Sequence, residues 1–137
     1  MSGRDALLAL AARCEAAEGP SRELDEAIVQ GVYPELDIRR DGPDGLWRAH
    51  GSTMGRACLL RVEDYTASLD AALTLVPKGW RWSLDYTQRA PYQDCGCAAL
   101  FAPGDGIKPP DVPETYARTP ALALCAAALR ALAEGRE

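Results

Sequence analysis

The end of the chain carries the pattern that most constrains the fold. Thr119 is a typical N-cap residue, and Pro120 follows it in the first helical turn, where its missing N–H costs nothing. Gly135 is a typical residue at a helix C-terminus. Between them, apolar residues recur at helical spacing with alanines widening the stripe: Leu122, Cys125, Leu129 and Leu132. The pattern predicts a helix whose apolar side must be buried against another layer.

Length and composition allow one domain and no more. The chain has 137 residues, of which 47% are apolar. A chain of this size is typical of a single domain and buries about two-thirds of its unfolded surface without needing a disulfide or a metal. We therefore treat residues 1–137 as one domain.

Three further helices are predicted in the first part of the chain. An apolar stripe over 5–18 ends at Gly19–Pro20. Ser21 is then a good N-cap for a second, shorter helix that ends at Gly31. Thr66 is expected to cap a third helix that runs through Leu75.

Strands are predicted between and after these helices. Residues 80–87 alternate aromatic or apolar with polar side chains, which is the strongest strand pattern in the chain. Residues 97–102 form a second apolar strand, and 89–96 and 103–113 are expected to be loops. Two short runs, 46–50 and 56–62, suggest a turn-rich edge hairpin. The order predicts an α+β fold, with a small antiparallel or mixed sheet layered with helices.

Several segments resemble a known family. Gly19–Asp25, Tyr65–Leu73 continuing to Val76–Trp80, and Thr119–Leu129 are similar to the phage ABA sandwich domain, a family of small phage and prophage proteins of unassigned activity. The resemblance implies an alpha-beta-alpha sandwich, a phage or prophage origin and a location in the cytoplasm of the host bacterial cell. Residues 32–64 and the segment 94–97 have no counterpart in it.

The charge balance excludes some classes of partner. The formal net charge is −5, and no block of lysine or arginine occurs. Duplex nucleic acids and anionic membranes are bound largely through clustered basic residues, so neither is an expected partner. A small anionic ligand stays possible, because two or three local arginines suffice to hold one phosphate.

The cysteines and the single histidine give little support for an enzyme. The five cysteines and an amphipathic start, rather than a signal peptide, suggest free thiols in a reducing cytoplasm. Cys14 and Cys125 fall on helix stripes and are expected in the core. Cys95 and Cys97 could hold zinc only if His50 and Cys58 lay beside them. We therefore expect that the chain is not an enzyme and that it binds no metal or cofactor. A Cys- or zinc-dependent hydrolase is the least favoured alternative.

Aromatic and arginine residues cluster on and after the strongest strand. Aromatic rings can stack on a base, and guanidinium groups can bind a phosphate. We therefore predict a ligand site made of Arg81, Trp82, Tyr86, Arg89 and Tyr92. Two other interpretations stay open: one face of this strand could be core beneath the helices, or it could be a subunit interface. The leading hypothesis is a non-catalytic phage accessory protein, a homo-oligomer, that binds a small anionic ligand. One version is a sponge for a nucleotide signal of bacterial immunity.

The alternative hypothesis is protein–protein binding. The first 31 residues carry an excess of acidic side chains, among them Glu23, Asp25 and Glu26. These acids could contact a basic host protein, as an inhibitor would, or the chain could be a virion accessory component.

Overall fold

The computed structural model describes most of the chain. The backbone is described for residues 3–34, 37–40, 47–53, 56–89, 92–104 and 110–135, and side chains for 3–34, 62–86, 95–104 and 110–135. Statements about what is present or absent below concern these residues.

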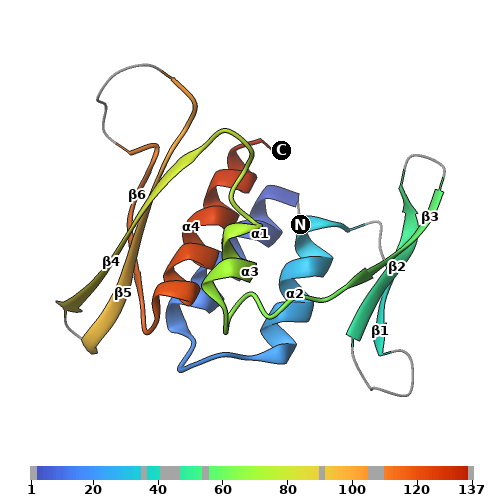
Figure 1. Cartoon of the computed structure of the whole chain (residues 1–137), viewed down its shortest axis with the longest axis horizontal. Helices are drawn as coiled ribbons and strands as arrows, with labels where there is room; N and C mark the ends of the chain where they lie inside the picture. The colour runs from blue at the N-terminus through green and yellow to red at the C-terminus, as the bar shows by residue number, and fades with distance from the viewer. Residues whose placement is uncertain are drawn as a thin grey trace.

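Four helices and two small sheets make up the described fold (Figure 1). The helices are α1 (Gly3–Ala16), α2 (Arg22–Val32), α3 (Leu69–Leu73) and α4 (Pro120–Glu134). One antiparallel sheet has the order β1 (Asp37–Arg40), β2 (Trp47–Thr53), β3 (Arg56–Arg61). The other has the order β4 (Arg81–Arg89), β5 (Tyr92–Phe101), β6 (Val112–Ala117). The predicted α+β class is confirmed, and the edge hairpin is present as β2–β3, with β1 added.

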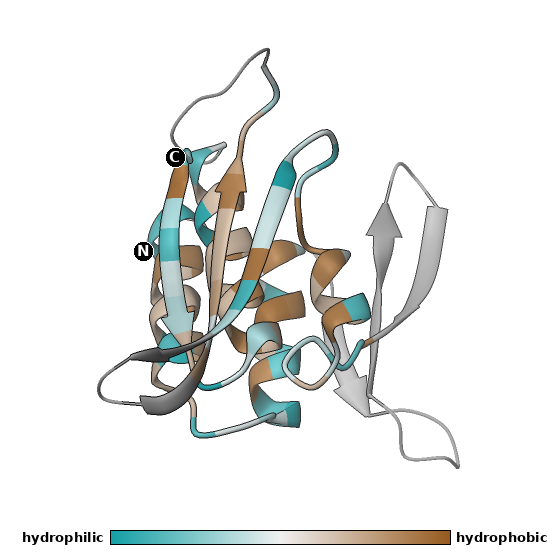
Figure 2. Ribbon diagram, turned by 60° about the vertical axis from the view of Figure 1, so that its left-hand side comes forward, coloured by the Kyte–Doolittle hydropathy of each residue, from teal (hydrophilic) through white to brown (hydrophobic). Residues whose placement is uncertain are grey.

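Helix α4 is the centre of the core. Its leucines Leu122, Leu124 and Leu129 are fully buried, and so are the alanines that alternate with them. It packs against α1 on one side and against β5 and β6 on the other. Thr119 caps it as predicted, its hydroxyl accepting a hydrogen bond from the N–H of Leu122 at 3.2 Å. Figure 2 shows the helices gathered against one face of the β4–β6 sheet. Among the described residues, no helix covers the other face.

Glycine at position 96 lets α4 approach the sheet. Gly96 lies in β5, and a Cβ there would come within 2.4 Å of the backbone of Thr119 and Pro120. The prediction of a loop over 89–96 is wrong, because most of this segment belongs to β4 and β5. β4 continues to Arg89, and β5 starts at Tyr92. Glycine is typical of turns, but at this position it allows a close approach of two backbones.

A buried carboxylate ties α2 to the start of α3. Asp25 is 1% exposed, and its Oδ1 accepts hydrogen bonds from the N–H and the hydroxyl of Thr66 at 2.9 and 2.8 Å. Arg22 donates to Asp25 Oδ2 at 3.2 Å and to Asp64 at 2.6 Å. Burial raises the pKa of the Asp25 carboxyl above its usual value, while the Thr66 hydrogen bonds and Arg22 oppose that rise.

This contact explains two corrections. Thr66 does not cap α3, because its hydroxyl is bonded to Asp25; Ser68 is the cap, its Oγ accepting from the N–H of Ala71 at 3.3 Å. Helix α3 is accordingly five residues long. The prediction that Glu23, Asp25 and Glu26 form an exposed acidic surface is wrong for Asp25, which is buried. Glu23 is exposed and Glu26 is half-buried.

Two smaller differences concern element ends. Helix α2 runs through Gly31 to Val32, where Gly31 packs closely against Leu10 of α1. Strand β6 falls in a segment for which no strand was predicted, because Pro113 and Glu114 interrupt its apolar pattern.

Among the described residues, no helix is long and apolar enough to span a membrane.

Replacing the buried carboxylate should destabilise the fold. Asp25→Ala leaves the buried N–H of Thr66 without its acceptor and removes one of two acceptors of the Thr66 hydroxyl, the other being the carbonyl of Ser21 at 3.2 Å. We expect a loss of about 2 to 3 kcal/mol in the free energy of unfolding. Urea denaturation followed by circular dichroism measures it. The matched control is Glu23→Ala in the same helical turn, which should cost less than about 1 kcal/mol. Equal losses for the two variants would contradict the assigned role of Asp25.

A methyl group at position 96 should be poorly tolerated. Gly96→Ala would force its Cβ into the backbone at the start of α4, and we expect a loss of at least about 3 kcal/mol or failure to fold. Gly19→Ala is the matched control, because nothing lies within 4 Å of a Cβ there. Its effect should stay within about 0.5 kcal/mol. A stable Gly96→Ala protein would show that α4 does not approach β5 this closely.

Candidate functional site

The candidate site lies on β4, the strand that the helices cover least. Among the described elements, β4 has one strand neighbour, β5, so its other edge is free. Helix α4 makes most of its sheet contacts with β5 and β6 and few with β4. Side chains on the helix-facing side of β4 are therefore only partly covered.

Two aromatic side chains on that side are exposed to solvent. Trp80 and Leu84 pack against the core, whereas Trp82 is 48% exposed and Tyr86 is 67% exposed. Tyr86 lies opposite Gly96 in the register, and a Cβ at Gly96 would face α4, which places both on the helix side. The interpretation of this face as core beneath the helices holds in part: Trp80 and Leu84 are half-buried against the core, whereas Trp82 and Tyr86 are exposed.

Arg81 lies on the opposite side of the strand. It pairs with Phe101 in the register, and its guanidinium carbon lies 5.6 Å from the centre of the Phe101 ring. Because side chains alternate along a strand, Arg81 points away from the side that carries Trp82 and Tyr86. The structure does not bring this arginine together with those aromatic rings.

The last two residues of the predicted site are placed by backbone only. Arg89 ends β4 and pairs with Tyr92 at the start of β5. Their side chains lie outside the described residues. Their part in the predicted ligand site stays a prediction.

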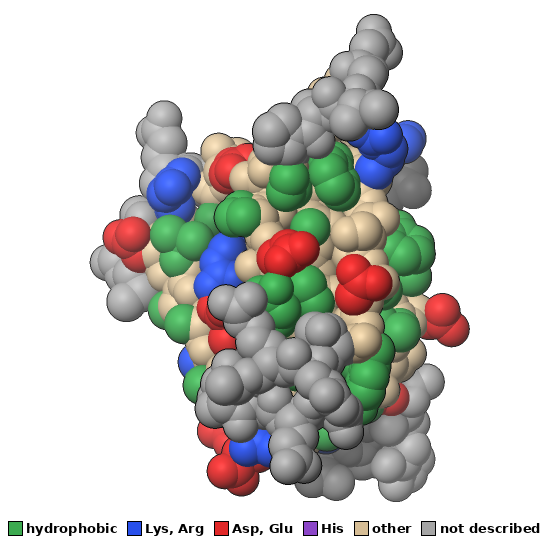
Figure 3. Space-filling model, turned by 90° about the vertical axis from the view of Figure 1, so that its left-hand side faces the viewer, with side chains coloured by type: hydrophobic (Ala, Val, Ile, Leu, Met, Phe, Trp, Pro, Cys, Tyr) green, Lys and Arg blue, Asp and Glu red, His purple; other side chains and the backbone are tan. Residues whose placement is uncertain are grey.

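A polar recess opens on the uncovered side of the sheet. It has a volume of about 200 Å³ and is lined by Asp85, Tyr86, Cys97, Glu114 and Tyr116. The hydroxyl of Tyr116 donates to Glu114 Oε2 at 2.6 Å. Figure 3 shows acidic side chains in the middle of this surface, with hydrophobic ones around them. The carboxylates of Asp85 and Glu114 make the recess unfavourable for an anion.

The Cys97 thiol in this recess is poorly suited to nucleophilic chemistry. Cys97 is 6% exposed. Burial raises the pKa of its thiol, and the nearby Glu114 carboxylate raises it further. The thiolate is the reactive form of cysteine, so a raised pKa lowers reactivity at neutral pH.

The zinc hypothesis finds no support in the described residues. No group of three or more His, Cys, Asp or Glu side chains that could hold a metal occurs among them. Cys95 and Cys97 lie in β5, whereas His50 and Cys58 lie in the other sheet, on β2 and β3. The side chains of His50 and Cys58 are outside the described residues.

The expectation that Cys14 and Cys125 belong to the core is confirmed. Both are fully buried, and burial raises the pKa of the Cys14 thiol to about 12. The Cys125 thiol donates to the carbonyl of Tyr65 at 3.2 Å, and burial raises its pKa as well.

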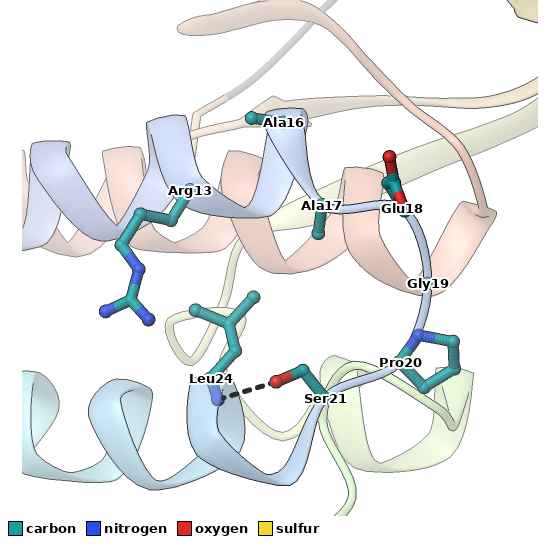
Figure 4. A pocket seen from close by; sticks show the side chains of 8 residues that line it. All are labelled: Arg13, Ala16, Ala17, Glu18, Gly19, Pro20, Ser21 and Leu24. Carbon is teal, nitrogen blue, oxygen red and sulfur yellow. Dashed lines mark hydrogen bonds between the residues drawn. The ribbon is translucent and has the colours of Figure 1, made fainter.

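A second recess, which the sequence did not predict, lies at the bend between α1 and α2 (Figure 4). It has a volume of about 490 Å³, and its lining includes Arg13, Glu18 and Leu24 beside the Gly19–Pro20 bend. The side chain of Arg13 extends from α1 towards α2 (Figure 4). Ser21 lines it too, but its Oγ accepts the N–H of Leu24 as a helix cap, at 3.1 Å. One arginine and one carboxylate at an open bend do not define a ligand.

Comparison with known proteins yields no relative. No family model, no curated protein and no solved structure matches the chain. The resemblance to the phage ABA sandwich domain, and the phage origin and host-cell location that it implies, stay predictions.

The described thiols should resist modification in the folded protein. In a Cys58→Ser variant the remaining thiols are Cys14, Cys95, Cys97 and Cys125, all buried. We expect them to react with Ellman's reagent only as fast as the protein unfolds, and all at once in urea. Rapid reaction of a native thiol, mapped to Cys97 by mass spectrometry, would contradict this and would revive a cysteine-dependent activity.

Proposed function

We propose that the chain is a non-enzymatic protein-binding module whose recognition surface is the free edge of β4. The single observation that carries the proposal is the pair of exposed aromatic side chains on this edge strand, Trp82 at 48% and Tyr86 at 67% exposure. Tryptophan and tyrosine are enriched among the residues that dominate binding energy at protein interfaces.

The backbone of β4 supplies the second part of the surface. An edge strand presents unpaired N–H and C=O groups to any strand that comes alongside. β4 has nine residues and no proline; its charged residues Arg81, Asp85 and Arg89 limit which strands can pair with this edge to those of matching charge. An extended segment added to β4 would gain main-chain hydrogen bonds, and the aromatic rings would give the contact its specificity.

A polypeptide partner fits this surface better than a small anion. Arg81, the described arginine of the predicted ligand site, lies on the other side of the strand from Trp82 and Tyr86. On the uncovered side of the sheet, to which Arg81 points, the recess is lined by the carboxylates of Asp85 and Glu114, which repel an anion. The proposal therefore favours protein–protein binding over the nucleotide sponge, and it moves the contact from the acidic α2 surface to β4.

The proposal is tested by removing the two rings together. The double variant Trp82→Ser with Tyr86→Ser should lose at least about 30-fold in affinity for any partner of this edge, which is the effect of one lost interface hot spot of about 2 kcal/mol. The folded chain is immobilised and exposed to bacterial lysate supplemented with a differently tagged copy of the chain. Bound proteins are quantified by mass spectrometry, and affinities by titration.

Tyr33→Ser is the matched control, because Tyr33 is 42% exposed and lies at the end of α2, away from β4. Partners should bind this variant as they bind the unmodified protein. A partner that still binds the double variant would contradict the proposal. So would a thermal shift with a nucleotide that the double variant loses, because that result assigns the rings to a small anionic ligand.

A further inference from the structure

We propose that the strand added to β4 is β4 of a second copy of this chain, paired antiparallel about a two-fold axis through Leu84. The proposal rests on the function proposed above and names its partner. It joins the β4–β6 sheets of two copies into one continuous sheet, three strands from each. The residues around Leu84 are complementary to themselves in this arrangement.

Hydrogen-bond geometry limits the possible registers. Along an edge strand, every second residue directs its N–H and C=O away from the neighbour it already has. Two copies of β4 can therefore pair antiparallel only when opposite residues are both even-numbered or both odd-numbered. A two-fold axis perpendicular to the sheet then keeps the helices of both copies on the same side.

Pairing about Leu84 matches aromatic with aromatic. Trp82 of each copy lies opposite Tyr86 of the other, and Leu84 lies opposite Leu84. All three are on the helix-facing side, where Trp82 and Tyr86 are left exposed in the single chain. Aromatic pairs are among the most stabilising cross-strand contacts, and here the symmetry makes the pair twice.

The charges on the other side of the strand fit the same register. Asp85 of one copy lies opposite Ser83 of the second copy. Arg81 of the second copy is the diagonal neighbour of this Asp85 and lies within reach of the Asp85 carboxylate. No two like charges lie directly opposite each other between Arg81 and Thr87. Opposite charges across strands stabilise a sheet, and like charges destabilise it.

The neighbouring registers are less favourable. Pairing about Asp85 sets Asp85 opposite itself and Arg81 opposite Arg89, so like charges meet at three places. Pairing about Ser83 sets Arg81 opposite Asp85, which is favourable, but it reduces the overlap to Arg81–Asp85. It also sets Tyr86 opposite Trp80, which precedes β4 and packs against the core. The register about Leu84 combines a long overlap with matched side chains on both faces.

The test uses a charge swap that depends on this register. Trp82→Glu alone and Tyr86→Lys alone should each raise the dimer dissociation constant at least about 10-fold, measured by sedimentation equilibrium over a range of protein concentrations. The double variant Trp82→Glu with Tyr86→Lys should recover dimerisation, because each new carboxylate then faces a new ammonium across the axis. Both positions are exposed in the single chain, so folding is checked by circular dichroism and should not change.

The matched control combines Trp82→Glu with Tyr33→Lys, which adds the same charges without the cross-strand contact and should not recover dimerisation. Failure of the Trp82→Glu, Tyr86→Lys variant to recover would overturn the register. A wild-type chain that stays monomeric, or a dimer that neither single variant weakens, would overturn the second copy as partner. If the monomeric chain still captures another protein through Trp82 and Tyr86, only this inference fails and the proposed function stands. If nothing is captured through them, both fail.

Discussion

The close packing of α4 on β5 is the constraint on which the rest of the structure depends. A helix made mostly of alanine and leucine is thin, so it can approach a sheet closely only where the sheet offers small residues. β5 provides Gly96 and Ala98 on this side, and the backbone at the start of α4 would collide with a Cβ at position 96. Once α4 lies there, α1 packs on its other side, and Arg130 on α4 bonds Thr115 of β6 at 3.2 Å and pairs with Glu15 of α1. Helix α4 therefore holds α1 and the β4–β6 sheet together.

The same packing determines which surface is left for binding. A single helix of this width covers β5 and β6 and leaves β4 at the border of the core. Trp80 and Leu84 still reach the core, while Trp82 and Tyr86 extend past it and stay exposed. Exposed aromatic rings beside a free strand edge are costly to keep in water and prone to association. The core packing and the proposed interface are thus two consequences of one geometry.

The sequence predicted the features that are set locally. The caps at Ser21 and Thr119, the stripe of α1, the whole of α4 and the alternation of β4 follow from residues within a few positions of one another. The errors come from contacts between distant segments. Thr66 has the right chemistry for a cap, but its hydroxyl is bonded to Asp25, 41 residues away. Gly96 has the chemistry of a turn, but it lies under α4. For the candidate site, the strand and its aromatic residues were found, yet whether Trp82 is buried depends on where α4 crosses the sheet, which no local pattern encodes.

The central claim is that the free edge of β4 is a pairing surface, and hydrogen exchange of its backbone amides tests it most directly. Amides that point away from β5 should exchange fast in dilute protein, because only solvent bonds them. At high protein concentration the same amides, between Arg81 and Thr87, should become protected, while those of α4 stay slow throughout. Protection in β4 that does not change with concentration, or with any added partner, would contradict the account.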